Sequence, residues 1–308
     1  MTTVATPPRV SAGALATAAP RSGRQRRSGT FLPTLFMAVF FVYFVLPLLW
    51  LLISSTKSNG ALFSSFGYWF AHPFNLFHNV RDVFAFNNGV FARWMANSAL
   101  YAVVSAGGAA LLAAFAGYGF AKYEFAGKRV LFGIILAGIA VPTTALAIPT
   151  YLLFSKIGIV DTPWAVVLPS LVSPFGIYLM RIYAAQSVDY SLIESARIDG
   201  ASELGIFFKV AWRLMMPGFI TVLLFTLVAT WNNYFLPLVM LNNPNYFPVT
   251  IGLNQWNASA NASGGGGGSQ AFFSIVVTGS LISIVPLVIA FLFLQRFWQS
   301  GLSTGAVK

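Results

Sequence analysis

The sequence predicts an all-α, polytopic membrane protein, a helix bundle with six transmembrane helices. Of its 308 residues, 57% are hydrophobic and only 8% are charged, whereas about a quarter of the residues in soluble domains are charged. Six apolar runs each approach or exceed the roughly 20 residues that an α-helix needs to cross a bilayer. The chain has no cysteine, so it offers neither a disulfide framework nor a thiolate metal site.

The chain begins with a segment, residues 1–30, that is rich in Ser, Ala, Pro and Arg. This composition predicts a disordered basic tail. The apolar run over residues 31–53 follows, and it is too long for the hydrophobic core of a secretory signal peptide. We therefore expect the first transmembrane helix there, within one membrane domain over residues 31–308.

Five further spans are predicted over residues 94–121, 130–155, 162–180, 214–240 and 271–294. Six spans place both termini on one side of the membrane. Cytoplasmic termini would put 14 of the 18 basic residues inside, which is the asymmetry typical of membrane proteins. The net charge of +11 therefore reflects topology, and no nucleic acid partner is expected, because the cations stand at the ends of apolar runs.

Two loops on the outer side are polar. Residues 57–93 contain His72 and His78, which have no carboxylate or cysteine at metal-ligand spacing, so solvated or interfacial histidines are expected there. Residues 241–270 end in a glycine run, residues 264–268, which predicts a flexible external tether.

Residues 190–217 are the one polar, patterned segment between long apolar runs, and the topology places them in the cytoplasm. Ser191 and Glu194 have the spacing of a capping box, which predicts a short helix that starts at Ser191. Gly200 can adopt the left-handed conformation that ends it. Charged side chains keep this helix out of lipid, so it is expected to be a solvent-side contact surface.

Catalytic chemistry is not indicated. All seven acidic residues fall in predicted loops or at span ends, and no charged residue occurs between Leu214 and Gln295. Ion-coupled transporters commonly keep ionisable groups within their spans, and an intramembrane hydrolase would need a nucleophile and a base there. The sequence thus predicts that the chain is not an enzyme. A stand-alone secondary transporter or channel for a small polar solute stays open as the alternative, and so does a membrane scaffold without transport.

The polar segment carries a family resemblance. Glu194, Ser195 and Ala196, followed after three residues by Gly200, resemble the EAA signature of ABC importer permeases. The extended form up to Ala201 is similar to the carbohydrate importer branch, the group that contains the maltose permease subunit. Other segments resemble that group in the same order along the chain: residues 97–98, 117–122, 174–176, 231–234, 295–297 and 301–308.

The resemblance implies the type I ABC importer permease fold, with residues 190–217 as a coupling loop and its short helix as a cytoplasmic coupling helix. It implies a sugar substrate (an oligosaccharide, a disaccharide or a related polyol), alternating access, and a multi-pass place in the plasma membrane. The implied partners are a second homologous permease subunit in a heterodimer, a cytoplasmic ABC ATPase dimer, an external solute-binding protein and membrane lipid. ATP and Mg²⁺ would be bound by the ATPase, so no cofactor is expected in this chain. The residues implied in ATPase coupling are Glu194, Ser195, Ala196, Asp199 and Gly200.

Two further groups of residues are candidates. Trp231, Asn232, Asn233 and Tyr234 lie about 30 Å along span five, where they can contact a passing sugar, pair with neighbouring helices, or anchor the chain at the interface. By family likeness, the external segment would contact the binding protein through Asn254, Gln255 and Trp256, and a plain flexible loop is the competing interpretation.

The chain also departs from the family pattern. Ser195 replaces the usual alanine, and the Asn pair at residues 232–233 replaces the more usual Asn-Asp. The family commonly has hydrophobic-x-Leu-Pro where residues 210–213 read Val-Ala-Trp-Arg, and proline follows only at Pro217. This leaves the entry of span five open.

Overall fold

The computed structural model describes residues 31–262 and 273–304. The chain divides into two compact units, residues 1–47 and 48–308. Within the described ranges the structure is helical and contains no β-strand, as predicted. The described part holds five helices long and apolar enough to cross a membrane, so a sixth span is not confirmed. They are Phe31–Ser55, Leu76–Lys122, Pro163–Ser187, Glu203–Trp231 and Phe273–Phe297.

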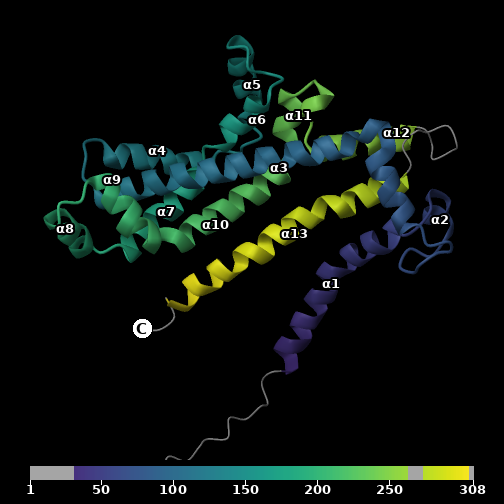
Figure 1. Cartoon of the computed structure of the whole chain (residues 1–308), viewed down its shortest axis with the longest axis horizontal. Coiled ribbons are helices and arrows are strands. Elements are labelled where there is room, and N and C mark those ends of the chain that lie inside the picture. The colour runs from purple at the N-terminus through teal and green to yellow at the C-terminus, as the bar shows by residue number, and fades with distance from the viewer. Residues whose placement is uncertain (1–30, 263–272, 305–308) are drawn as a thin grey trace, which may run out of the picture. The chain divides into compact units, whose positions relative to one another are not determined.

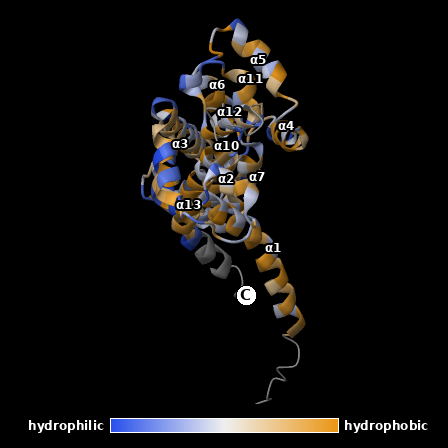
Figure 2. Ribbon diagram, turned by 90° about the vertical axis from the view of Figure 1, so that its right-hand side faces the viewer, coloured by the Kyte–Doolittle hydropathy of each residue, from blue (hydrophilic) through white to orange (hydrophobic). Residues whose placement is uncertain are grey.

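Helix α1 spans Phe31–Ser55 and crosses the boundary between the two units. Its residues in the first unit are apolar on every side and exposed, and Figure 2 shows the helix hydrophobic along its length. Phe40 packs against both Phe36 and Phe44, with ring centroids 4.4 and 6.3 Å away. A helix that is apolar all round suits lipid contact, which fits the predicted first span.

In the second unit, a buried polar cluster holds the end of α1. The amide of Asn79 donates 2.8 Å hydrogen bonds to the carbonyl oxygens of Ser55 and Lys57. The buried ammonium of Lys57 donates to the carbonyl oxygen of Phe66 at 2.7 Å. The polar segment that follows α1 is thus folded, and it includes α2 (Asn59–Ser64).

The centre of the second unit is formed by α3 (Leu76–Lys122), α7 (Pro174–Ser187), α10 (Trp212–Trp231) and α13 (Phe273–Thr304), as Figure 1 shows. Small residues bring these helices close together. A Cβ atom at Gly117 of α3 would meet Met180 of α7 at 2.5 Å, and one at Gly176 would meet Val222 of α10 at 2.8 Å. Both glycines lie in segments that carry the family resemblance, residues 117–122 and 174–176.

The prediction of one continuous third span over residues 130–155 is wrong. The structure has two shorter helices there, α4 (Lys128–Ala140) and α5 (Ala147–Lys156). Pro142 explains the break, because a proline disfavours the helical conformation of the residue before it. Val141 accordingly has φ −79° and ψ 122°.

The predicted fourth span is also interrupted and longer than expected. It consists of α6 (Pro163–Ser170) and α7, separated by residues 171–173. The hydroxyl of Ser173 accepts a 3.1 Å hydrogen bond from the Gly176 amide and so caps α7. The helix continues to Ser187, beyond the predicted end at residue 180.

The fifth span begins in the polar segment, well before the predicted start at Leu214. Helix α9 (Glu203–Ile206), a π-helical turn (Phe207–Ala211) and α10 run on as one helical stretch. A π turn widens the helix without ending it, and Phe207 within it stacks on Phe115 of α3 at 4.6 Å. At its other end the helix stops at Trp231, and the chain becomes helical again only in α11 (Phe235–Met240). The prediction of an unbroken span to residue 240 is therefore wrong.

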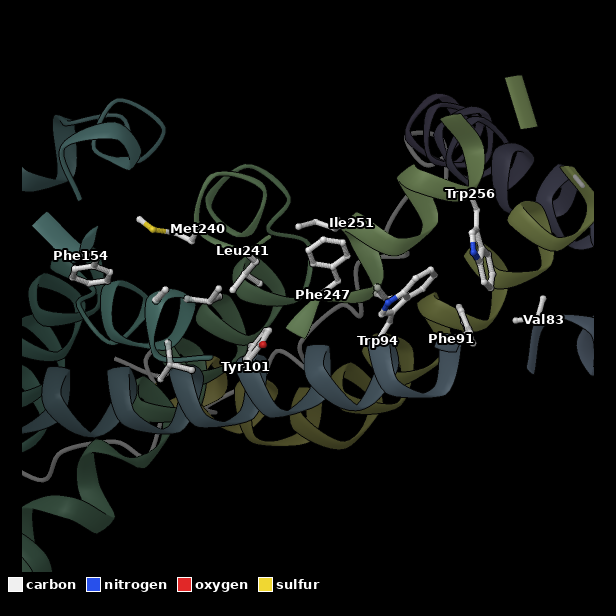
Figure 3. Close-up of a cluster of buried hydrophobic side chains, with 14 of the residues drawn as sticks. Val83, Phe91, Trp94, Tyr101, Phe154, Met240, Leu241, Phe247, Ile251 and Trp256 are labelled. Carbon is white, nitrogen blue, oxygen red and sulfur yellow. The ribbon is translucent and has the colours of Figure 1, made fainter. Parts of the chain in front are cut away.

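The described part of the segment predicted as a loop, residues 241–262, is folded. It contains a 3₁₀ turn (Pro244–Tyr246) and α12 (Val249–Ala262). Figure 3 shows Trp256 of α12 turned toward Trp94 and Phe91 of α3, and the two tryptophan rings lie 4.9 Å apart. The predicted basic tail over residues 1–30 and the glycine run over residues 264–268 lie outside the described residues.

Candidate functional site

Helix α8 spans Tyr190–Ile198 and forms the polar segment predicted as a contact helix. Ser191 and Glu194 both lie inside the helix, and no side chain caps its N-terminus, so the predicted capping box is not formed. The C-terminus follows the prediction, because Gly200 has φ +78°. The amide of Gly200 bonds the carbonyl oxygen of Arg197, and the amide of Ala201 bonds that of Ala196, both at 3.0 Å, which is a Schellman motif.

One face of α8 is anchored and the rest is exposed. Ile193 is 2% exposed and packs in a hydrophobic cluster with Ala196 beside it. Four of the five residues implied in coupling, Glu194, Ser195, Asp199 and Gly200, are exposed, and Ala196 is half-buried. Ile198 is 87% exposed although it is apolar. A fixed helix that presents mixed apolar and charged residues is suited to contact with another protein.

Glu203 joins α8 to two other elements. Its Oε1 atom accepts a 2.7 Å hydrogen bond from Arg197 Nε in α8, and its Oε2 atom accepts one of 2.5 Å from the hydroxyl of Tyr123, just after α3. Desolvation and the bond to Glu203 raise the pKa of Tyr123 above its ordinary value, which keeps its hydroxyl a donor. The same carboxylate raises the pKa of Arg197. Glu203 is the first residue of α9, so this network reaches directly into the fifth span.

Three helix breaks surround one cavity of about 770 Å³. The breaks lie between α4 and α5, between α6 and α7, and between α10 and α11. Irregular backbone at membrane depth is tolerated where it is buried in protein or lines a water-filled cavity. The cavity is lined by aliphatic side chains, by hydroxyl and amide side chains and by aromatic rings, and none of the described residues that line it is charged.

Of the four candidate residues in span five, three line this cavity: Asn232, Asn233 and Tyr234. Trp231 does not, because its side chain is 6% exposed and its indole N–H donates to the Ser283 carbonyl oxygen at 3.2 Å. The Asn side chains bond their own segment, not neighbouring helices as the alternative interpretation expected. Asn232 Nδ2 donates to the Val228 carbonyl at 2.9 Å, and Asn233 Oδ1 accepts from the Leu236 amide at 3.3 Å.

The three candidate residues of α12 have different surroundings. Asn254 and Gln255 are exposed, and the Asn254 Oδ1 atom accepts a 3.3 Å hydrogen bond from the Tyr234 hydroxyl. Trp256 is only 4% exposed and belongs to the aromatic core. Its ring is covered by the Phe91 and Trp94 side chains of α3, whereas Asn254 and Gln255 stay open to solvent.

Comparison with known proteins identifies the family of this chain. Residues 106–300 match the family described as binding-protein-dependent transport system inner membrane component. The match includes α8, all three helix breaks and α12. This chain belongs to that family. It is a permease component, and the family is one of transport components, not of enzymes.

Two relatives of the permease are arabinooligosaccharides transport system permease proteins AraQ. That of Bacillus subtilis is 31% identical over 226 residues, which cover 73% of this chain and 77% of the relative. That of Halalkalibacterium halodurans is 34% identical over 71% of this chain and 75% of the relative. A chain of a bacterial ABC transporter involved in the import of the acidic polysaccharide alginate has the same fold, with a TM-score of 0.75 and 23% identity. The match covers 91% of the permease and all of that chain.

The motif at residues 97–98 lies outside the matched range, and both of its side chains form hydrogen bonds in the permease. Asn97 Nδ2 donates to the carbonyl oxygens of Asn245 and Phe247 at 2.8 and 3.0 Å, and the Ser98 hydroxyl accepts from the Val249 amide at 2.8 Å. These bonds hold the 3₁₀ turn and α12 against α3.

Sequence reasoning missed Tyr123 and the bridging role of Glu203, because no local pattern connects the two residues.

Proposed function

We propose that this permease is one transmembrane subunit of an ABC importer for a neutral oligosaccharide, disaccharide or related polyol. Membership of the binding-protein-dependent family carries the proposal. Two relatives named for arabinooligosaccharide transport support a saccharide substrate. In this proposal the chain lies in the plasma membrane with both termini in the cytoplasm, and a second homologous permease subunit completes the pathway in a heterodimer.

In the proposal, α8 docks on a cytoplasmic ABC ATPase dimer through Glu194, Ser195, Ala196, Asp199 and Gly200. The exposure of α8, its fixed end at Gly200 and its attachment to the fifth span through Glu203 support this role. ATP and Mg²⁺ are bound by the ATPase subunits, and this chain holds no cofactor. Closure of the ATPase dimer moves α8 as a rigid body, and alternating access follows.

The cavity at the three helix breaks is the proposed part of the substrate path in this chain. Sugars present many hydroxyl groups and apolar ring faces, and both suit a lining of Thr, Ser and Asn side chains beside Tyr234. The lack of charge among the described lining residues favours a neutral solute over an acidic one, because a carboxylate there would lack a cationic partner. Asn254 and Gln255 remain the residues proposed to face the external solute-binding protein.

Reconstitution tests the proposal. We expect proteoliposomes with both permease subunits, the ATPase and the binding protein to take up a neutral saccharide only when ATP is present. The chain alone should give no uptake under a proton or sodium gradient. Gradient-driven uptake by the chain alone would instead make it a secondary transporter.

A further inference from the structure

A second cavity, of about 720 Å³, lies where α3 ends and α4 begins. Its walls come from the end of α3, the segment that follows it, the first turns of α4, and Arg181 in the middle of α7. It is distinct from the cavity at the three helix breaks, because the two share no lining residue. It lies at the same end of the bundle as α8, since the Tyr190 hydroxyl donates to the Ala121 carbonyl oxygen at 3.3 Å.

Three cations line this second cavity: Lys128, Arg129 and Arg181. Lys128 is already satisfied, because its ammonium bonds Glu124 Oε1 at 2.7 Å and the Tyr123 carbonyl oxygen at 2.9 Å. Within the described residues, neither arginine forms an ion pair. The cavity therefore carries two guanidinium groups whose charge is not neutralised by a carboxylate.

Aromatic rings fix the position of one of these cations. The guanidinium of Arg181 lies 4.0 Å from the centre of the Phe132 ring, and the Phe120 ring lies 5.5 Å from that ring, tilted against it. A guanidinium stacked in this way keeps its N–H groups free at the edge. Its planar donors match the oxygen atoms of a phosphate.

The flank of the cavity is apolar and exposed. Val130 and Ile134 of α4 are 68% and 63% exposed, and the helix has no buried residue. This surface continues along α4 away from its charged first turn. A ligand that fits both parts has an anionic head and a long apolar tail, which a free phosphate does not have.

We propose that this cavity binds the phosphate headgroup of an anionic phospholipid, through Arg129 and Arg181, with the acyl chains lying along α4. Basic pockets between transmembrane helices are known to hold anionic headgroups. The bound lipid would fill the space beside the segment that connects α3 to α4, next to Tyr123.

Native mass spectrometry of the full chain in detergent tests this site. The probes are phosphatidylglycerol and phosphatidylcholine with identical acyl chains. We expect the wild type to retain phosphatidylglycerol over phosphatidylcholine. In the R129Q/R181Q variant, the ratio of the two retained lipids should fall about fivefold for each cation removed. R129K/R181K should keep most of it, and R213Q, which changes an exposed arginine outside the cavity, should keep all of it.

Three results would overturn the proposal. An unchanged preference in R129Q/R181Q would place the lipid elsewhere. Displacement of phosphatidylglycerol by millimolar inorganic phosphate would assign the site to a soluble anion. Loss of the preference when the chain is purified with its partner subunits would mean that protein, not lipid, covers the cavity. Equal thermal unfolding midpoints for the wild type and R129Q/R181Q would show that a lost preference does not come from misfolding.

Discussion

The hydroxyl of Tyr123 donates a 2.5 Å hydrogen bond to the carboxylate of Glu203, which ties the segment after α3 to the first turn of α9. The other oxygen of that carboxylate is bonded to Arg197 of α8. Three elements are thereby held at one side chain. A force on α8 would reach both α3 and the fifth span through this contact, which makes Glu203 a positioning residue for the proposed coupling.

Replacing Glu203 with Gln should weaken coupling without preventing assembly. The amide keeps the shape but loses the charge that both donors recognise. We expect uptake per ATP hydrolysed to fall by about two- to thirtyfold, the range seen for residues along coupling networks. Transport and ATP hydrolysis are measured together in proteoliposomes. Tyr123→Phe removes one of the two bonds and should have a smaller effect.

The matched control for Glu203 is Asp82→Asn. Asp82 also pairs with a neighbouring side chain, His78, at 3.3 Å and is half-buried, but it lies in the first part of α3, far along the chain from α8. It should leave the ratio of uptake to hydrolysis unchanged. If both variants lower the ratio equally, the effect is one of surface charge and the positioning role is wrong.

Replacing Gly200 with Val should abolish uptake while the protein still enters the membrane. Gly200 has φ +78°, and no atom lies within 4 Å of a Cβ added there. The cost of the substitution therefore comes from the backbone conformation alone. That conformation costs an L-residue about 1–2 kcal/mol, and more for a β-branched one. The end of α8 should then leave its Schellman turn. Uptake and the amount of protein in the membrane are the two measurements.

Gly60→Val provides the comparison for Gly200. Gly60 is also in open space but lies in α2 without a positive φ. We expect normal uptake from this variant. Normal uptake from Gly200→Val as well would remove the argument that the shape of this turn matters for docking.

Local rules explain why part of the site could be predicted from the sequence. The contact helix and its end at Gly200 depend on residues a few positions apart, so pattern and turn chemistry were sufficient. The break after α4 also had a local signal in Pro142, which the apolar composition of residues 130–155 outweighed. By contrast, Tyr123 and Glu203 are distant in the sequence, and only the packing of α3 beside α9 brings them together.

The segment over residues 241–270 shows how a correct local observation can mislead. Its glycine run suggested a flexible tether, but the preceding residues Val249, Gly252, Trp256 and Ala260 are all buried and recur at helical spacing. This helical spacing of residues was present in the sequence. Its partner surface on α3 was not visible there, because Trp94 was assigned only to the start of a span.

Gly252→Ala should destabilise the permease through this contact. A Cβ atom at Gly252 would overlap the Trp94 indole, which is itself enclosed by Trp256. Overpacking of this kind costs about 1–3 kcal/mol. The expected result is a lower midpoint of thermal unfolding in detergent. Gly107→Ala, in the middle of α3 with no atom near the new methyl group, should be neutral or slightly stabilising. Equal midpoints for the two variants would contradict the close packing of α12 on α3.

Thr230→Trp should block the proposed substrate path. Thr230 lies in the last turn of α10, beside the break at Asn232, and lines the cavity of about 770 Å³. The indole would occupy space that a saccharide needs, and a clash of about 1–3 kcal/mol with the bound solute corresponds to roughly a 5- to 150-fold loss of uptake. ATP hydrolysis and thermal stability should change much less, because the side chain enters a space that is already open.

Two variants serve as controls for Thr230→Trp. Thr230→Ser keeps the hydroxyl and should transport normally, while Leu112→Trp places the same indole at a residue of α3 that is 53% exposed and outside the cavity. Uptake lost only in Thr230→Trp would support passage of the solute through the three helix breaks. If Thr230→Trp transports as well as Leu112→Trp, the solute does not pass through this cavity.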